Sequence, residues 1–167
     1  MTTSRPAPNG YSKAQIALHW AVVLLVAAQY LLNETISGAW SARTAGETFA
    51  FHPLILAHVA GGSLILALVV WRVVLRLRRG EPQPPANEPA PLRRLGHLAH
   101  WAFYAILAGM AVSGMVAWFG GVTQAAAAHN ILKVVLLALV ALHVLAVIFH
   151  RIVLKNDLLG RMIRPAE

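Results

Sequence analysis

Four long apolar stretches dominate the sequence and predict its architecture. They cover residues 14–32, 53–75, 98–119 and 125–154. A helix needs about 20 mainly apolar residues to cross a hydrocarbon core of about 30 Å, and each stretch is of that order or longer. The pattern predicts an all-α protein in which residues 1–167 form one integral membrane domain, a four-helix bundle.

The polar segments between these stretches predict the connections. Residues 33–52 are neither charged nor apolar enough to form a domain, and a short surface helix or a lid over a cofactor would suit this external loop. Residues 80–92 contain five of the nine prolines, which predicts an extended, hydrated connection. Ser12 is a candidate N-cap for the first helix.

Composition and charge placement support this topology. Hydrophobic residues make up 58% of the chain and charged residues only 12%, which is typical of a membrane protein. If the chain crosses four times, twelve of its fourteen Lys and Arg residues fall on one side. The positive-inside rule then predicts that both termini are cytoplasmic. Contact with anionic lipid headgroups accounts for the net charge of +8, so no nucleic acid is expected as a partner.

The chain contains no cysteine, and this limits its redox chemistry. A covalently attached c-type haem, an iron–sulfur cluster and a disulfide are all excluded. Any haem must therefore be held by axial histidines and non-covalent contacts.

The fourth apolar stretch carries three histidines, His129, His143 and His150. The first two are 14 positions apart, which is close to four helical turns, so they share a face at a separation of roughly 21 Å. Imidazole is costly in hydrocarbon, and intramembrane histidines usually face the bundle interior and serve a site. One histidine near each membrane surface suggests two stacked cofactors.

Matching histidines by depth gives two predicted ligand pairs. His19 lies roughly 9 Å from the inner boundary and His143 roughly 12 Å from it, whereas His58 and His129 both lie near the outer surface. We therefore predict the pairs His19–His143 and His58–His129, each holding one haem iron. Ligation by two imidazoles suits electron transfer by low-spin haem. His100 has a similar depth and remains an alternative to the assigned inner ligand.

Several other polar residues have two interpretations each. Lys133, one turn below His129, could pair with a propionate of the outer haem or extend to the interface. Arg72 could likewise pair with a propionate or extend to the interface. His150 and His97 could contact a propionate, a quinone oxygen or interfacial water. A metal or proton transporter is disfavoured, because the predicted spans lack paired carboxylates.

Three segments resemble the bacterial cytochrome b561 family of four-helix, di-haem, quinone-linked cytochromes. They are YSKAQIALHW, HPLILAHVAGG and the closing pattern His129-x13-His143-x6-His150 followed by LKNDLLGRM. The resemblance covers nearly the whole chain and implies two haem b groups held by His19, His58, His129 and His143. It also implies a multi-pass protein of the bacterial inner membrane that exchanges electrons with ubiquinone.

The resemblance leaves the electron donor open. One type of family member oxidises superoxide at the periplasmic side and reduces ubiquinone, and this implies a superoxide:ubiquinone oxidoreductase. Related haem subunits instead anchor a partner dehydrogenase or hydrogenase in the membrane and accept its electrons. Arg43 is the one Lys or Arg of the external loops.

Overall fold

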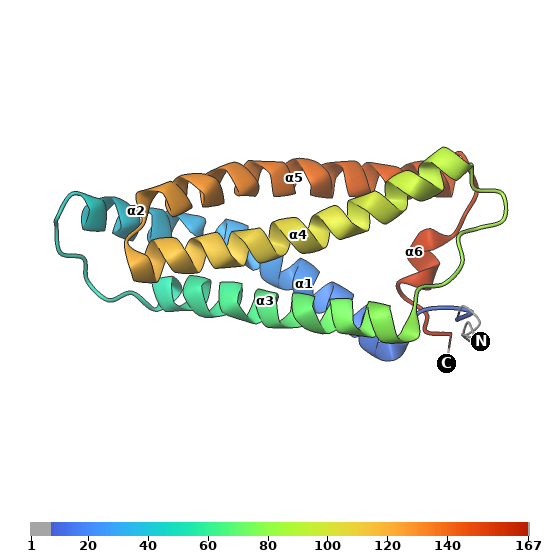
Figure 1. Cartoon of the computed structure of the whole chain (residues 1–167), viewed down its shortest axis with the longest axis horizontal. Helices are drawn as coiled ribbons and strands as arrows, with labels where there is room; N and C mark the ends of the chain where they lie inside the picture. The colour runs from blue at the N-terminus through green and yellow to red at the C-terminus, as the bar shows by residue number, and fades with distance from the viewer. Residues whose placement is uncertain (1–7, 167) are drawn as a thin grey trace, which may run out of the picture.

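The computed structural model describes residues 8–166, and in that part of the chain it contains helices and no strand. Four helices are long and apolar enough to cross a membrane, which confirms the predicted number of spans. They are α1 (Lys13–Leu31), α3 (Pro53–Arg79), α4 (Ala90–Gly120) and α5 (Thr123–Ile152). Two shorter helices, α2 (Asn33–Thr44) and α6 (Leu158–Arg161), lie at opposite ends of the bundle (Figure 1).

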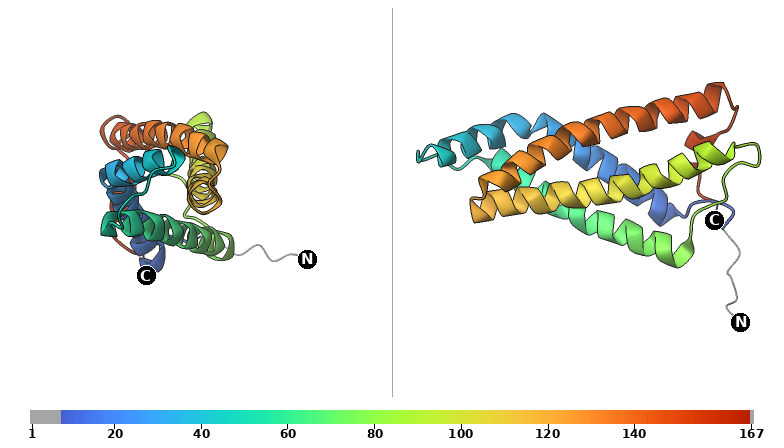
Figure 2. Two further views of the ribbon diagram at one scale, coloured as in Figure 1. Left: turned by 90° about the vertical axis from the view of Figure 1, so that its left-hand side faces the viewer. Right: turned by 45° about the horizontal axis from the view of Figure 1, so that its top comes forward.

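The long helices pack in a chain of neighbours rather than around one solid core. α4 packs against α5 and α3, and α3 packs against α1 (Figure 2). A small cluster of buried side chains fills the middle of the bundle: Val22, Ile65, Val69, Leu107 and Leu136. Within the described residues, α5 makes its close backbone contacts with α4 and α6, whereas it meets α1 and α3 through side chains.

The outer faces of the helices are apolar, as contact with lipid requires. Leu24, Val134 and Leu142 each expose more than 60% of their surface. In water such a surface would cost free energy, but lipid tails are as apolar as leucine. The bundle is therefore built to bury its outer surface in hydrocarbon.

The helix boundaries follow local sequence signals. Ser12 caps α1 in a reciprocal arrangement with Gln15, as its N-cap prediction requires. Gly121 ends α4 in the left-handed conformation, with φ of 68°. α4 begins at Ala90, eight residues before the predicted start at 98, and thus includes the end of the predicted loop 80–92. Proline is compatible with the first turn of a helix, so Pro91 does not prevent this early start.

α2 occupies the external segment for which a surface helix was one prediction. At its first residue, Asn33 accepts a hydrogen bond from Lys133 Nζ at 3.4 Å. Near its end, Arg43 Nη1 donates to the Trp118 carbonyl at 2.6 Å, and the guanidinium lies 5.9 Å from the Trp118 ring centre. Two cationic side chains thus fix α2 against α4 and α5.

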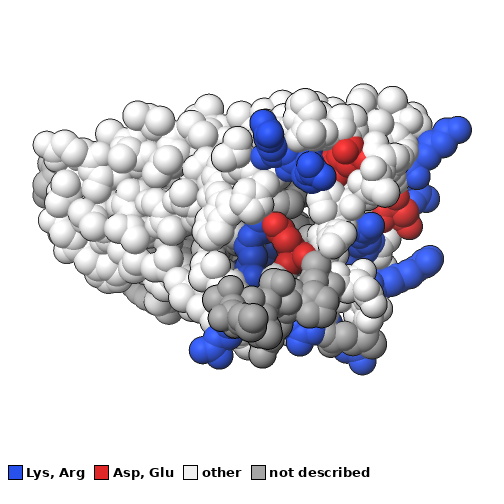
Figure 3. Space-filling model, turned by 45° about the vertical axis from the view of Figure 1, so that its right-hand side comes forward, with Lys and Arg blue, Asp and Glu red and all other residues white. Residues whose placement is uncertain are grey.

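The opposite end, which we call the terminal end, carries both ends of the described chain and most of the basic residues (Figure 3). Trp20 Nε1 donates to the Met162 carbonyl at 2.8 Å, and Arg161 donates to the Gln83 carbonyl at 2.8 Å. Burial, followed by the nearby Glu81 carboxylate, raises the pKa of Tyr11 above its usual value. The terminal segments and the α3–α4 connection therefore form one interlocked cap.

Candidate functional site

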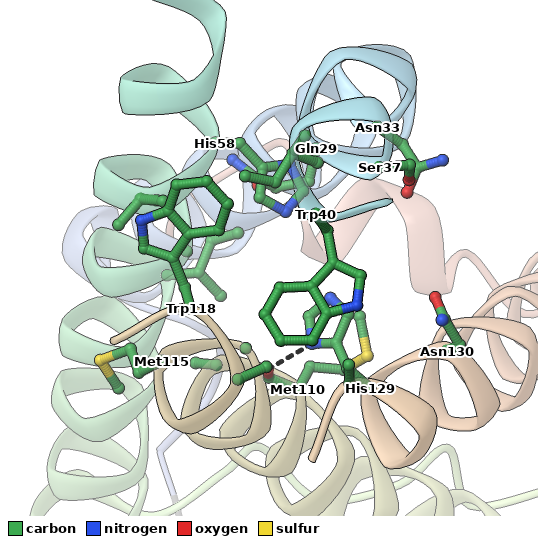
Figure 4. A pocket seen from close by; sticks show the side chains of 18 of the residues that line it. Gln29, Asn33, Ser37, Trp40, His58, Met110, Met115, Trp118, His129 and Asn130 are labelled. Carbon is green, nitrogen blue, oxygen red and sulfur yellow. Dashed lines mark hydrogen bonds between the residues drawn. The ribbon is translucent and has the colours of Figure 1, made fainter. Parts of the chain in front are cut away.

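A cavity of about 270 Å³ lies near the α2 end, lined by residues from α1 to α5. His58 on α3 and His129 on α5 face each other across it, with ring centres 6.5 Å apart (Figure 4). The helices that carry these residues do not pack closely on each other, so the two imidazoles project into shared space. The two residues predicted as the outer pair are thus brought together.

The hydrogen bond of His129 determines which ring nitrogen is free. Its Nδ1 lies 2.8 Å from the Met110 carbonyl oxygen, the bond drawn in Figure 4. A carbonyl can only accept, so Nδ1 carries the proton and Nε2 keeps its lone pair. A backbone acceptor behind a histidine is the arrangement that orients metal-ligating imidazoles.

Small residues and an unpartnered nitrogen shape the rest of this pair. A Cβ on Gly114 would lie 3.1 Å from both Nδ1 and Cε1 of His129, so the glycine allows the ring to lie against α4. His58 Nδ1 is buried and has no hydrogen-bond partner. An orphaned buried nitrogen costs free energy unless a ligand or a shift of the ring satisfies it.

These features fit a haem iron with two axial imidazoles. Two metal–nitrogen bonds of about 2 Å and the two half-widths of the rings add up to roughly 6 Å, close to the 6.5 Å observed. The described residues form no group of three or more His, Cys, Asp or Glu side chains that could hold a bare metal ion. Two histidines alone would leave a metal ion short of ligands, and the nitrogens of a porphyrin ring would supply the others.

Polar side chains gather on the α2 and α5 side of the cavity. Asn33, Ser37 and Asn130 line this side, away from Met115 and Trp118 (Figure 4). Lys133 contacts Asn33, and its carbonyl accepts a hydrogen bond from Tyr30 at 2.5 Å. Lys133 therefore lies beside the polar side of the cavity, and its pairing with a propionate remains a prediction.

A second group of histidines lies toward the terminal end. The His143 ring centre is 6.0 Å from that of His100 and 5.3 Å from that of Phe103. His19 contacts Trp20 edge to face at 5.3 Å, and it lies within electrostatic range of His100 and His143. Both residues considered as the partner of His143 are therefore near it.

Helix origin and ring distance point to different partners for His143. His100 comes from α4, which packs on α5, and its ring centre lies 6.0 Å from that of His143, close to the 6.5 Å of the outer pair. His19 comes from α1, across the bundle from α5, in the same relation as α3 and α5 at the outer pair. The ring distance fits His100 and the helix relation fits His19, so His19 as the ligand opposite His143 stays a prediction and His100 stays the alternative.

Arg72, predicted as a propionate partner, lies among these inner histidines. Its guanidinium lies within electrostatic range of both His19 and His100. Its Nη1 is buried and has no hydrogen-bond partner. A buried guanidinium nitrogen without an acceptor fits an anionic group of a bound cofactor.

His150, the third histidine of the α5 face, has protein partners for both ring nitrogens. Nδ1 contacts the Ala146 carbonyl at 2.7 Å, and Nε2 contacts a Glu88 carboxylate oxygen at 3.2 Å. The structure thus gives it partners other than the predicted propionate or quinone. Sequence reasoning does not single out Glu88, because a glutamate in a proline-rich connection carries no signal of its function.

His97, the other histidine near this surface, is more exposed. Its Nδ1 lies 3.2 Å from Glu81 Oε1, and its Nε2 accepts from Trp101 Nε1 at 3.1 Å. Arg76 pairs with the same carboxylate at 2.7 Å. His97 is therefore part of an ion-pair cluster at the terminal end.

Comparison with known proteins shows the family of the chain. Residues 10–165 match the family described as prokaryotic cytochrome b561. Cytochrome b562 of Cereibacter sphaeroides is 32% identical over 93% of this chain and 96% of its own length. The probable superoxide oxidase CybB of Yersinia pestis is 29% identical over 91% of this chain and 94% of its own length. The family implies haem b as the cofactor, and the chain belongs to the prokaryotic cytochrome b561 family, multi-pass electron-transfer proteins of the bacterial inner membrane.

Proposed function

We propose that the chain is a di-haem cytochrome that carries electrons through the inner membrane from a periplasmic donor to ubiquinone. The observation that supports this most is that α5 presents His129 and His143 to two other histidine-bearing regions at different depths. Each haem, when bound, supplies a one-electron couple whose potential depends on its ligands and burial. The clustering of basic residues at the terminal end supports a cytoplasmic location for both termini.

At the outer site, His58 and His129 hold the iron. The Met110 carbonyl fixes the tautomer of His129 and increases the basicity of its free nitrogen. Lys133 supplies positive charge beside the polar side of the cavity, where a propionate would be placed. Residues of α2 line the cavity on the side that we place toward the periplasm.

At the inner site, His19 and His143 hold the iron, and Arg72 supplies the charge for a propionate. Phe103 packs edge to face against His143 and restricts the orientation of its ring. Two imidazoles at each site would suit electron transfer rather than binding of a substrate to the iron. Ubiquinone, which is soluble in lipid, accepts electrons from the inner side.

Superoxide is our leading candidate for the donor, because one relative is named a probable superoxide oxidase. Arg43 places a cation at the α2 end, close to Trp118, which lines the outer cavity. A positive charge at that position favours the approach of an anion.

The test combines an absorption spectrum with stopped-flow kinetics of the purified chain. We expect a b-type haem spectrum and reduction of haem by superoxide faster than dismutation alone allows. A spectrum without a Soret band would contradict haem binding. A normal spectrum without reduction above the dismutation background would contradict superoxide as the donor.

A second candidate is an electron-transfer subunit that docks to a dehydrogenase or hydrogenase. In the described residues near the α2 end, both cations already have hydrogen-bond partners: Arg43 donates to Trp118 and Lys133 to Asn33. Cations held in this way attract a free anion such as superoxide less strongly, which favours a docked protein as the donor. A partner protein that copurifies in equal amounts and supplies electrons would support this role, whereas quinone reduction by the isolated chain with superoxide would contradict it.

A further inference from the structure

A buried histidine and glutamate face each other at the terminal end, outside both candidate haem sites. His150 is on the last turns of α5, and Glu88 is in the connection between α3 and α4. The side chains of both are only 10% exposed, and Nε2 lies 3.2 Å from Oε1. Neither residue is one of the four proposed axial ligands.

The surrounding hydrogen bonds determine the number of protons that this pair shares. His150 Nδ1 is 2.7 Å from the Ala146 carbonyl oxygen, which can only accept, so Nδ1 carries a proton. The contact between Nε2 and Oε1 then requires one more proton on one of these two atoms. Without it, a nitrogen lone pair would face a carboxylate oxygen in a buried site, which is unfavourable.

The pair lies close to the inner candidate site. His150 follows His143 by seven positions, so it shares the same helix face at a separation of roughly 10 Å along the axis. Charges at this distance interact appreciably when the space between them is filled by protein rather than water. A change of one electron at the inner site must therefore alter the affinity of the pair for its shared proton.

We propose that His150 and Glu88 form a proton-sharing pair whose protonation is coupled to the redox state of the inner haem. This inference depends on the proposed function. An added negative charge at the inner site would strengthen binding of the shared proton, which would come from water at the terminal end. Removal of that charge would weaken it. The only bond made or broken is the N–H or O–H bond of the shared proton.

Other charges near the pair are already engaged or exposed. Arg151, the next residue on α5, pairs with Asp157 at the start of α6. Arg161 on α6 donates to the Gln83 carbonyl of the same connection as Glu88. Three cations near the start of α4 and after the end of α5 are exposed to solvent: Arg93, Arg94 and Lys155. These charges influence the affinity of the His150–Glu88 pair for its shared proton, but their exposure to water weakens any coupling between them and the haem.

A purely structural role for the pair is the alternative, because Asn87 Nδ2 also attaches this connection to the Leu154 carbonyl at 3.2 Å. The variant Glu88→Gln separates the two roles. A glutamine can still hydrogen-bond to His150, but it cannot share or release the proton. Glu81→Gln is the matched control, because Glu81 contacts His97 at the same 3.2 Å in the same connection but is 35% exposed, with His97 at 55%.

The experiment is a spectroelectrochemical titration of the purified full chain from about pH 6 to about pH 10, a range that covers free and ion-paired imidazole. The inner haem is assigned by comparison with His129→Ala. We expect the inner potential of the wild-type chain to fall with rising pH over part of this range. The steepest possible slope corresponds to uptake of one proton per electron. The potential then falls by about 59 mV per pH unit, the equivalent of a tenfold change in the equilibrium constant.

Glu88→Gln is expected to flatten this dependence and Glu81→Gln to leave it unchanged. An inner potential independent of pH in the wild-type chain would overturn the proposal, as would a full dependence in Glu88→Gln. If Glu88→Gln does not assemble, His150→Gln is the second variant, with the same expected flattening. Absence of haem would instead contradict the proposed function, so the two failures are distinguishable.

Discussion

Gly114 offers a direct test of how α4 positions the outer ligand. A Cβ at this position would lie 3.1 Å from Nδ1 and Cε1 of His129. Ordinary contacts between carbon atoms are about 3.5–4.0 Å, so in Gly114→Ala the ring must move by roughly half an ångström. Such a shift disturbs the 2.8 Å bond from Nδ1 to the Met110 carbonyl.

Two opposing effects determine how Gly114→Ala changes the stability of the protein and its affinity for the outer haem. Alanine in place of glycine within a helix stabilises the helix by about 0.8–1.0 kcal/mol. Overpacking a rigid neighbour costs about 1–3 kcal/mol, and here the cost falls on the orientation of a ligand. We expect little change in overall stability but a loss of affinity for the outer haem of about 5- to 150-fold, the equivalent of that energy.

The assay measures the rate at which haem passes from the purified protein to an excess of a haem-scavenging apoprotein. Gly109→Ala is the control, because it is on the same helix and its Cβ would meet only a terminal methyl of Leu132, at 3.3 Å. We expect faster loss of the outer haem in Gly114→Ala alone. Equal rates in both variants, or loss confined to the inner haem, would refute the role given to Gly114.

Further predictions concern the inner site and the terminal end. His19→Ala is expected to remove the inner haem and His100→Ala to retain it, because we propose that His19 and His143 are the inner ligands; haem content per chain checks this. Lys155 has φ of 56°, so Lys155→Gly is expected to raise the free energy of unfolding by up to about 1 kcal/mol, measured by denaturant unfolding in detergent. Burial raises the pKa of Tyr11 in the folded chain, so its contribution to stability is complete below about pH 10 and is lost as pH rises through the higher folded value. Thermal unfolding of Tyr11→Phe should therefore show a smaller alkaline loss of stability than wild type.

Helix number and histidine depth could be predicted from the sequence, because both depend on quantities that run along the chain. Span length follows from hydropathy, and the rise per residue converts position into depth. The pairing of His58 with His129 was accessible on this basis, and their rings do lie together.

Position around the bundle axis could not be predicted in the same way. His19 and His100 have similar depths, and only the packing of α4 on α5 shows why the His100 ring lies beside His143. The His150–Glu88 contact joins residues 62 positions apart through a proline-rich connection that carries no periodic signal. The bond between Lys133 and Asn33 likewise depends on how α2 folds over the cavity.

The number of haems bound per chain tests most directly whether α5 supplies one ligand to each of two irons. A pyridine haemochromogen assay, normalised to protein, gives this number for the wild-type chain, His129→Ala and His143→Ala. We predict two haem b groups in the wild-type chain and one in each variant, with different remaining spectra. A wild-type value of one, or unchanged content in either variant, would contradict the account.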